Sequence, residues 1–488
     1  MQVIADTGVH VTLAHYSAVA HLAAAVDKLR AAAAELVPRL RGRTVWMVNS
    51  TAQGGGVAEL LPAQITLLRD LGLDVRWAVI ETDKAEFFAL TKRLHNLIHD
   101  SDAPHPTAKD RELYDAVNRD NAAALGELLQ PHDILVVHDP QPAGLGALLK
   151  RERGTRTVWR SHIGVEQDTA NTRAAWEFLR PYAEAYDEVV FTLPDYAPGY
   201  LRQRAVTIHP TIDPLGHKNR ELSLHKMVGI LCDARLVVPH WPLLDPPFEE
   251  GAQRLQPDGS FAAATMPDDI GLLARPIVTQ VSRWDRLKGF APLLDAFRLL
   301  KSGAVDLPLR DDRHGRRLAE VRLVLAGPDP SAIQDDPEGL EVLDHLRERW
   351  LALDSRVQRD VALVTLPMAS RKHNALMVNA LQRSSDIVVQ NSLREGFGLT
   401  VSEAMWKRTP VLGPARAAGV RLQVRDGVDG RLVDDPEDVQ TLAAALHDML
   451  SDSDRLDTWG HSAQRRVHDE FLMLGELVSW LNLLAGER

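Results

Sequence analysis

Short apolar runs alternate with amphipathic stretches along the first part of the chain. The runs are rich in Val, Ile and Thr, and helical stretches such as 57–71 and 110–129 separate them. Alternation of this kind predicts a parallel sheet covered by helices. The predicted strands are residues 44–48, 75–80, 134–137, 157–159, 188–192 and 206–209.

Helices are also predicted near both ends of the chain. Apolar residues between positions 16 and 37 recur at steps of three and four, and Pro38 ends the pattern. Near the other end of the chain, residues 471–484 are again helical in pattern. Because this last helix follows a completed sheet, we expect it to pack back on the first domain.

The middle of the chain breaks the rhythm and separates two similar regions. Prolines and glycines crowd residues 213–273, which predicts a linker carrying an insertion. Further strands follow at 277–281, 321–326, 361–366, 386–390 and 410–412. We therefore predict two doubly wound, Rossmann-like α/β domains facing a central cleft, with ligands at the carboxyl ends of the strands. The predicted boundaries are 1–213 for the first domain, 214–274 for the linker and insertion, 275–470 for the second domain, and 471–488 for the final helix.

Charge and cysteine content restrict the classes of function. The 488 residues contain 56 Lys and Arg against 67 Asp and Glu, a net charge of −11, so we expect no nucleic-acid partner. One cysteine, Cys232, cannot form an internal disulfide or a multi-thiolate metal site. No run reaches the roughly 18 apolar residues of a spanning helix, and no secretory signal is recognised, so we expect a cytoplasmic protein without a membrane partner. An anionic ligand would need a local cluster of cations.

Such cations follow the first strand of the second domain. Arg283 offers a planar fork and Lys288 a point charge, and both suit a diphosphate held against the end of a sheet. The alternative for either residue is a surface salt bridge. These cations can supply the charge neutralisation that a metal supplies elsewhere, so no metal or other cofactor is expected.

Two acidic residues lie near the fourth strand of the second domain. Glu395 is in the loop after this strand, and Glu403 should lie about one turn inside the helix that follows. A carboxylate beside a phosphate would repel it, so these groups are better suited to accept hydrogen bonds from the hydroxyls of a sugar or ribose. Glycines at 396 and 398 let the loop turn inward. The alternative is an ordinary helix start with favourable acids.

Polar residues also follow three strands of the first domain. Residues 54–56 are three glycines at a predicted helix start, which forms an anion site or simply a strand-to-helix turn. Asp139 and Gln141 follow the third strand, and Arg160 with His162 lie at the end of the fourth. These four side chains could line a polar pocket. The two Asp-x-Asp sequences, at 100–102 and 452–454, fall away from strand ends, and no metal site is predicted.

Taken together, these positions resemble the retaining glycosyltransferases of family 4, which have the GT-B fold. Glu395 and Glu403 match the Glu-x7-Glu motif of that family, and Arg283 and Lys288 match its diphosphate-binding cations. Longer segments look like the trehalose glycosyltransferring synthases and the related trehalose phosphorylases. These segments are residues 48–60, 138–142, 160–163, 210–214, 280–289 and 394–407.

The resemblance implies transfer of glucose from a nucleoside-diphosphate glucose to free glucose, which forms α,α-trehalose reversibly and with retention. In this interpretation Glu395 contacts a hydroxyl of the donor sugar, Glu403 the ribose, and His162 the donor glucose. The implied catalytic residues are Glu395, Arg283, Lys288 and His162. The implied donor-binding residues are Gly54, Gly55, Gly56, Gly396, Phe397, Gly398, Leu399 and Glu403, and the acceptor-binding residues are Asp139, Gln141 and Arg160.

Three other functions stay open. A trehalose phosphorylase would use phosphate and release glucose 1-phosphate, and another enzyme of the same family would use a different acceptor. A non-catalytic sensor of nucleotide sugars is a third possibility, although a sensor need not carry Arg283, Lys288, Glu395 and Glu403 together. The expected partners are sugars and a nucleotide sugar, and a homodimer stays open.

Overall fold

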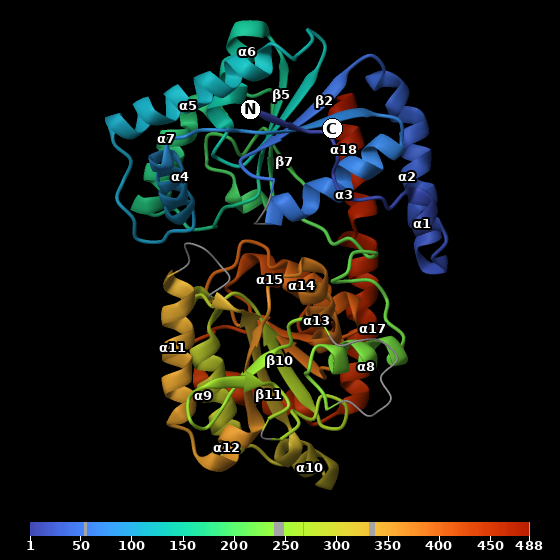
Figure 1. The fold of residues 1–488 in the computed structure, drawn as a ribbon, viewed down its shortest axis with the longest axis vertical. Helices are drawn as coiled ribbons and strands as arrows, with labels where there is room; N and C mark the ends of the chain where they lie inside the picture. The colour runs from blue at the N-terminus through green and yellow to red at the C-terminus, as the bar shows by residue number, and fades with distance from the viewer. Residues whose placement is uncertain (53–55, 239–247, 267, 331–336, 488) are drawn as a thin grey trace. The chain divides into compact units, whose positions relative to one another are not determined.

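The computed structural model describes the chain except residues 53–55, 239–247, 267, 331–336 and 488. The chain forms two compact units. The first consists of Met1–Thr211 together with Phe471–Arg488, and the second is Ile212–Glu470. The first unit therefore contains residues from both ends of the sequence (Figure 1).

A seven-stranded sheet forms the centre of the first unit, with strand order β1-β3-β2-β4-β5-β6-β7. All neighbours in this sheet are parallel except β1, which runs antiparallel to β3 and was not predicted. The other six strands lie where the apolar runs predicted them. The bounds are β1 (Gln2–Ile4), β2 (Thr44–Asn49), β3 (Asp74–Val79), β4 (Ile134–His138), β5 (Arg156–Ser161), β6 (Glu188–Phe191) and β7 (Ala205–Thr207).

Helices cover this sheet, and two of them come from opposite ends of the chain. The final helix, α18, packs against α2 and buries Leu477, Trp480 and Leu484 (Figure 1). The helices of the first unit are α1 (Leu13–Ser17), α2 (Ala23–Leu36), α3 (Gly56–Asp70), α4 (Ala85–Ile98), α5 (Ala108–Gly126), α6 (Ala143–Arg153), α7 (Ala170–Ala183) and α18 (Met473–Ala485).

The helix predicted over residues 16–37 is interrupted. α1 ends at Ser17, whose hydroxyl donates to the carbonyl of Leu13 at 3.0 Å. The backbone then becomes extended at Val19, a β-branched residue, before α2 begins at Ala23. Pro38 lies in a short 3₁₀ turn that follows α2. The apolar period was correct over α2, where Val26, Leu29 and Leu36 are buried, but periodicity alone does not reveal one extended residue.

An eight-stranded sheet forms the centre of the second unit, with strand order β15-β14-β13-β10-β11-β12-β8-β9. The strands from β10 onward are mutually parallel, whereas β8 and β9 form an antiparallel pair added at the edge of β12. The bounds are β8 (Gln253–Leu255), β9 (Phe261–Ala263), β10 (Ile277–Val281), β11 (Arg322–Pro328), β12 (Val361–Leu366), β13 (Ile387–Val389), β14 (Val411–Pro414) and β15 (Gly430–Val433).

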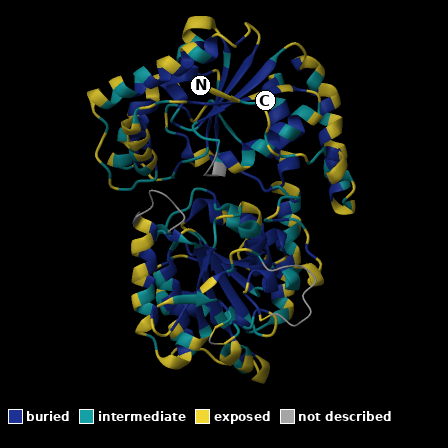
Figure 2. Cartoon of the chain, viewed as in Figure 1, coloured by how far each residue is buried: buried dark blue, intermediate teal, exposed yellow. Residues whose placement is uncertain are grey.

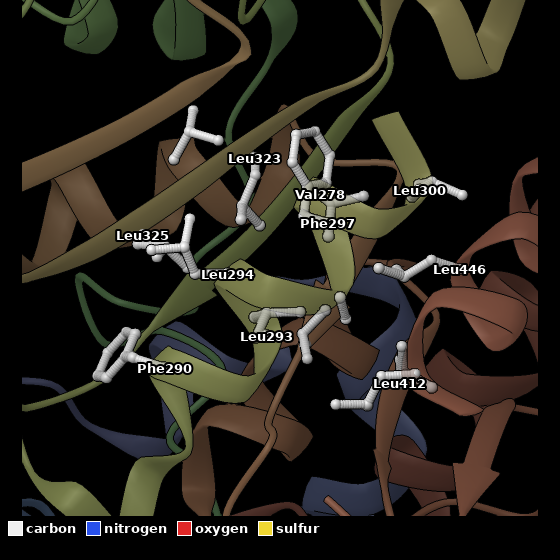
Figure 3. Packing of buried hydrophobic residues seen from close by; sticks show 14 of the residues in the cluster. Val278, Phe290, Leu293, Leu294, Phe297, Leu300, Leu323, Leu325, Leu412 and Leu446 are labelled. Carbon is white, nitrogen blue, oxygen red and sulfur yellow. The ribbon is translucent and has the colours of Figure 1, made fainter. Parts of the chain in front are cut away.

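The second unit has a dense apolar core on one side of this sheet. Phe290, Leu294 and Phe297 of α9 pack on Val278 of β10 and Leu325 of β11 (Figure 3). Figure 2 shows the central strands of both units as buried, and it shows exposed residues on the outer surfaces of the helices. The helices of this unit are α8 (Leu224–Asp233), α9 (Phe290–Lys301), α10 (Asp312–Glu320), α11 (Pro337–Leu351), α12 (Ser355–Asp360), α13 (Arg371–Arg383), α14 (Leu399–Trp406), α15 (Ala418–Gln423), α16 (Val439–Leu450) and α17 (Ser453–Glu470).

The segment 214–274, predicted as a linker with an insertion, is part of the second unit where the structure describes it. α8 packs against α13, and its Leu231 is fully buried. The hairpin of β8 and β9 extends the sheet of the unit. Prolines and glycines in this segment therefore mark turns between packed elements. Within the described residues, no helix is long and apolar enough to span a bilayer.

Candidate functional site

An ion pair joins two loops at the carboxyl ends of neighbouring strands in the second unit. Lys288 ends a short 3₁₀ turn after β10, and Glu395 lies in the loop after β13. β10 and β13 are adjacent and parallel, so both loops lie at the same edge of the sheet. Nζ of Lys288 is 2.6 Å from Oε2 of Glu395. The structure thus brings together two residues that the sequence singled out separately.

Hydrogen bonds hold the Glu395 carboxylate in its charged form. Nε2 of Gln390 and Oγ of Ser392 donate to its Oε2 at 3.0 Å and 2.9 Å. Burial alone would raise the pKa of Glu395. The charge and hydrogen bond of Lys288, together with the hydrogen bonds of Ser392 and Gln390, instead hold this pKa below its ordinary value. The side chain is therefore an ionised hydrogen-bond acceptor.

Two buried amides connect the same loops. Nε2 of Gln280 donates to the carbonyl of Lys288 at 2.7 Å, and its Oε1 accepts from the backbone N–H of Asn391 at 3.1 Å. Nδ2 of Asn391 donates to the carbonyl of Gly289 at 3.0 Å. Sequence reasoning missed both amides. The available signal was a polar residue inside the apolar run of β10, since a fully buried polar side chain needs partners.

The loop between β13 and α14 is shaped by close backbone approaches. Gly398 has a φ of +80° at the start of α14, and a Cβ there would lie 2.9 Å from Cγ of Glu395. A Cβ on Gly419 would lie 2.4 Å from Cα of Phe397. Nε2 of Gln423 donates to the carbonyl of Phe397 at 2.6 Å, another contact that the sequence did not reveal. Gly396 lies in the same loop, and Leu399 is the first residue of α14.

Glu403 is buried on α14 among cations. Nζ of Lys218 is 3.9 Å from its carboxylate, and Nζ of Lys407 donates to its backbone carbonyl at 2.8 Å. Burial lowers the pKa of Lys407 to about 7, and the charge of Glu403 opposes this shift. Neither lysine was predicted. Arg283, in contrast, is exposed in the turn after β10.

In the first unit, Asp139 and His162 lie together at the ends of β4 and β5. Oδ1 of Asp139 accepts a hydrogen bond from the backbone N–H of His162 at 2.8 Å. Asp139 has a φ of +66°, which is uncommon for a residue other than glycine. Nδ1 of His138 lies 3.0 Å from Nε2 of His162. The loop after β4 is therefore fixed directly against the end of β5.

Arg160, near the end of β5, is a fully buried cation. None of its three guanidinium nitrogens has a hydrogen-bond partner in the part of the chain that the structure describes. Burial lowers its pKa to about 10, while the charges of Glu476 and Asp139 act in the opposite direction. Glu476 lies on α18, far from Arg160 in sequence, and was not predicted. Its own pKa is raised by burial, against the hydrogen bond from Thr211 and the charge of Arg160.

Gln141 and the glycine triplet are the remaining predicted positions of the first unit. Oε1 of Gln141 is buried and has no hydrogen-bond partner among the described residues. Gly56 is the first residue of α3, whereas Gly54 and Gly55 lie outside the described residues. The predicted anion site at this glycine triplet therefore stays a prediction.

Asp139→Asn is expected to stabilise the protein above pH 6. Burial raises the pKa of Asp139 to about 6, with the His162 amide and the Arg160 charge opposing it. The native state thus holds its proton more tightly than the unfolded chain, and the wild-type protein loses stability as the pH rises from about 4 to 6. Asparagine does not titrate, keeps an acceptor for the amide, and tolerates positive φ.

The gain in unfolding free energy should approach about 3 kcal/mol above pH 6 and shrink toward pH 4. Denaturant unfolding of both proteins at about pH 4 and about pH 8 measures it. If the two proteins differ in unfolding free energy by the same amount at both pH values, the raised pKa does not belong to Asp139.

Two histidines that sequence reasoning overlooked lie close together at the end of α4. His95 lies in the last turn of α4 and His99 one turn later, with ring centroids 4.4 Å apart. Across the described residues, no group of three or more His, Cys, Asp or Glu side chains is placed to hold a metal ion. The pair alone does not define a metal centre.

Comparisons with known proteins place the chain in a family. The family model described as "Trehalose synthase, N-terminal domain" matches residues 47–198, and that described as "Glycosyl transferases group 1" matches 368–466. The chain is 34% identical to a trehalose synthase of Pyrococcus horikoshii over 92% of this chain and 91% of the relative. It is 26% identical to a trehalose phosphorylase of Grifola frondosa, over 89% of this chain and 56% of the relative.

A solved structure supports the fold. The α,α-trehalose-phosphate synthase of Burkholderia xenovorans, in complex with glucose-6-phosphate, superposes with a TM-score of 0.64 at 16% identity. The match covers 91% of this chain and all of the other. The protein is a glycosyltransferase with the GT-B fold, as the sequence predicted. Within that class, the chain belongs to the trehalose synthase family, and its activity is glycosyl transfer in trehalose chemistry.

Proposed function

We propose that the protein transfers glucose from a nucleoside-diphosphate glucose to free glucose, forming α,α-trehalose reversibly and with retention. The observation that carries this proposal is the Lys288–Glu395 pair, which sets a cation and an ionised hydroxyl acceptor side by side at the carboxyl ends of β10 and β13. A nucleotide sugar needs both groups, since its diphosphate and its sugar hydroxyls are adjacent. The similarity to named trehalose synthases supports the choice of product.

The proposed chemistry follows from the charge that develops on the leaving group. As the glycosidic bond to phosphate breaks, negative charge grows on the diphosphate, and a preplaced cation stabilises that state more than the ground state. Lys288 supplies this charge, with Arg283 as a second cation in the same loop. Glu395 accepts a hydrogen bond from a donor-sugar hydroxyl, and Glu403 from the ribose. These cations make a metal ion unnecessary in the proposed reaction.

Retention is assigned to attack on the face from which the leaving group departs. No carboxylate was singled out as a nucleophile, so the leaving phosphate assists the acceptor hydroxyl in place of a covalent glycosyl intermediate. In the first unit, His162 is assigned to the donor glucose. Asp139 and Gln141 are assigned to the acceptor, and their polar groups suit an uncharged sugar that both donates and accepts hydrogen bonds. Arg160, the third acceptor residue that the resemblance implies, is fully buried, so it is assigned an indirect role through its charge on Asp139.

The test is an incubation of purified protein with glucose and a panel of UDP-, ADP- and GDP-glucose, analysed by product chromatography. We expect a non-reducing disaccharide with at least one donor, formed without added metal and in the presence of a chelator. Transfer only to a different acceptor would replace the proposed acceptor, and no product with any acceptor would favour a sensor. The control is the same incubation without glucose.

A second candidate is a trehalose phosphorylase, which the match to the Grifola frondosa protein favours. Trehalose breakdown separates the two functions. A phosphorylase would require phosphate and release glucose 1-phosphate, whereas the proposed transferase would require a nucleoside diphosphate. We expect breakdown to respond to the nucleoside diphosphate alone.

A further inference from the structure

A buried histidine, His138, contacts the ring of His162. His138, the last residue of β4, is 1% exposed, whereas the His162 side chain is only half-buried. Nδ1 of His138 and Nε2 of His162 are 3.0 Å apart, and the two rings are inclined by 19°. Two nitrogens at this distance share one proton, so one ring donates and the other accepts.

Both rings are neutral. Burial and the charge of Arg160 lower the pKa of His138 to about 3. Burial, Arg160 and His138 together lower the pKa of His162 well below its ordinary value. Each ring therefore carries one N–H, and the direction of the shared hydrogen bond fixes the tautomer of both rings.

The surroundings of His138 decide this direction. Its other nitrogen, Nε2, is buried and has no hydrogen-bond partner within the described residues. If His162 donated the shared proton, the proton of His138 would lie on Nε2 as a buried, unmatched N–H, which is rare. If His138 donates from Nδ1, Nε2 instead bears a lone pair, and the nearby positive charge of Arg160 favours a lone pair over an N–H.

We propose that His138 is a positioning residue that donates from Nδ1 to Nε2 of His162 and thereby holds the proton of His162 on Nδ1. No described residue hydrogen-bonds Nδ1 of His162, so this N–H is presented to a ligand oxygen. The backbone of His162 is fixed as well. Its N–H donates to Asp139 at 2.8 Å, and its carbonyl accepts from the hydroxyl of Thr192 at 3.1 Å.

With backbone and ring both held, His162 presents one donor in one direction. A sugar hydroxyl would meet this N–H without first reorienting the ring, so the contact loses little entropy on binding. That the ligand oxygen belongs to the donor sugar rests on the proposed function. The tautomer itself depends only on the contacts of His138 and Arg160.

The tautomer is measured in the ligand-free protein. Long-range ¹H–¹⁵N correlation of protein labelled at histidine should show His162 protonated at Nδ1, and His162→Asn assigns the signal by its loss. Protonation at Nε2 would overturn the proposal. An inactive wild-type protein with the Nδ1 tautomer would instead reject the proposed function and leave this inference standing.

Two substitutions then separate positioning from packing. His138→Phe keeps a planar aromatic ring, slightly larger than imidazole, but removes the donor, and we expect mixed tautomers at His162 and a kcat roughly 10- to 100-fold lower in the folded protein. His138→Asn carries its amide N–H near the Nδ1 position, and we expect it to restore the tautomer and most of kcat.

His461→Phe is the control, since this exposed histidine of α17 forms a hydrogen bond with a backbone carbonyl of its own helix. An unaltered tautomer and kcat in His138→Phe would overturn the proposal. If His138→Phe does not fold, the wild-type spectrum and the His138→Asn protein still decide.

Discussion

Replacing Lys288 by alanine is expected to lower kcat by a factor of several hundred to a thousand. Removal of one preorganised donor to a developing negative charge typically costs about 3 to 4 kcal/mol of transition-state stabilisation. In this protein the loss is aggravated because Glu395, 2.6 Å away, would stay charged beside the leaving diphosphate. Steady-state kinetics with saturating donor and acceptor measures the effect.

Arg286→Ala provides the matched control for Lys288→Ala. Arg286 lies two residues earlier in the same turn, but its side chain is 72% exposed and pairs with Glu341. A surface pair of this kind contributes about 0 to 1 kcal/mol, so stability and kcat should hardly change. Near-normal turnover in folded Lys288→Ala protein would contradict the assignment of Lys288 to the diphosphate.

Gly419→Ala is expected to reduce both stability and activity, although Gly419 carries no chemistry. The new Cβ would lie 2.4 Å from Cα and 2.5 Å from the carbonyl oxygen of Phe397, both backbone atoms of the loop that holds Glu395. Because backbone cannot give way as a flexible side chain does, the loop must shift. We expect a loss of about 1 to 3 kcal/mol in unfolding free energy and a fall in kcat of at least roughly tenfold.

The control for Gly419→Ala is Gly229→Ala. Gly229 lies in α8 of the same unit, and a Cβ there would meet no atom within 4 Å. Alanine in a helix is favoured over glycine by roughly 0.5 to 1 kcal/mol, so this variant should be slightly more stable and fully active. Denaturant unfolding and kcat of both proteins test the pair, and an active, stable Gly419→Ala protein would show that the loop tolerates displacement.

The parallel strands β2 to β7 and β10 to β14 were predictable because buried parallel strands are short apolar runs whose ends are local in sequence. The strands β1, β8, β9 and β15, which lie at the edges of the two sheets, were missed. The position of Lys288 after β10 and of Glu395 after β13 followed from the same pattern. Their 2.6 Å contact did not, because it requires β10 and β13 to be neighbours in the sheet. Strand order is decided by tertiary packing, and the sequence between two strands does not state it.

The supporting polar residues could not be predicted for a related reason. Gln280, Asn391 and Gln423 act through hydrogen bonds to backbone atoms of other segments, so their sequence neighbours carry no sign of the partner. Glu476 is a charged residue in a helix that looked like ordinary packing. Its relation to Arg160 exists only because α18 returns to the first unit. Local patterns locate candidate chemistry, and distant contacts fix its geometry.

The return of α18 has a consequence for the order of synthesis. When the ribosome has completed Thr211, every strand of the first sheet has been made, but α18 and its Glu476 will follow only after the whole second unit. Until then the nascent first unit holds the Arg160 cation without this opposing carboxylate, and the surface of α2 that α18 covers is open to water. The second unit can fold on its own sequence, whereas the first is completed last.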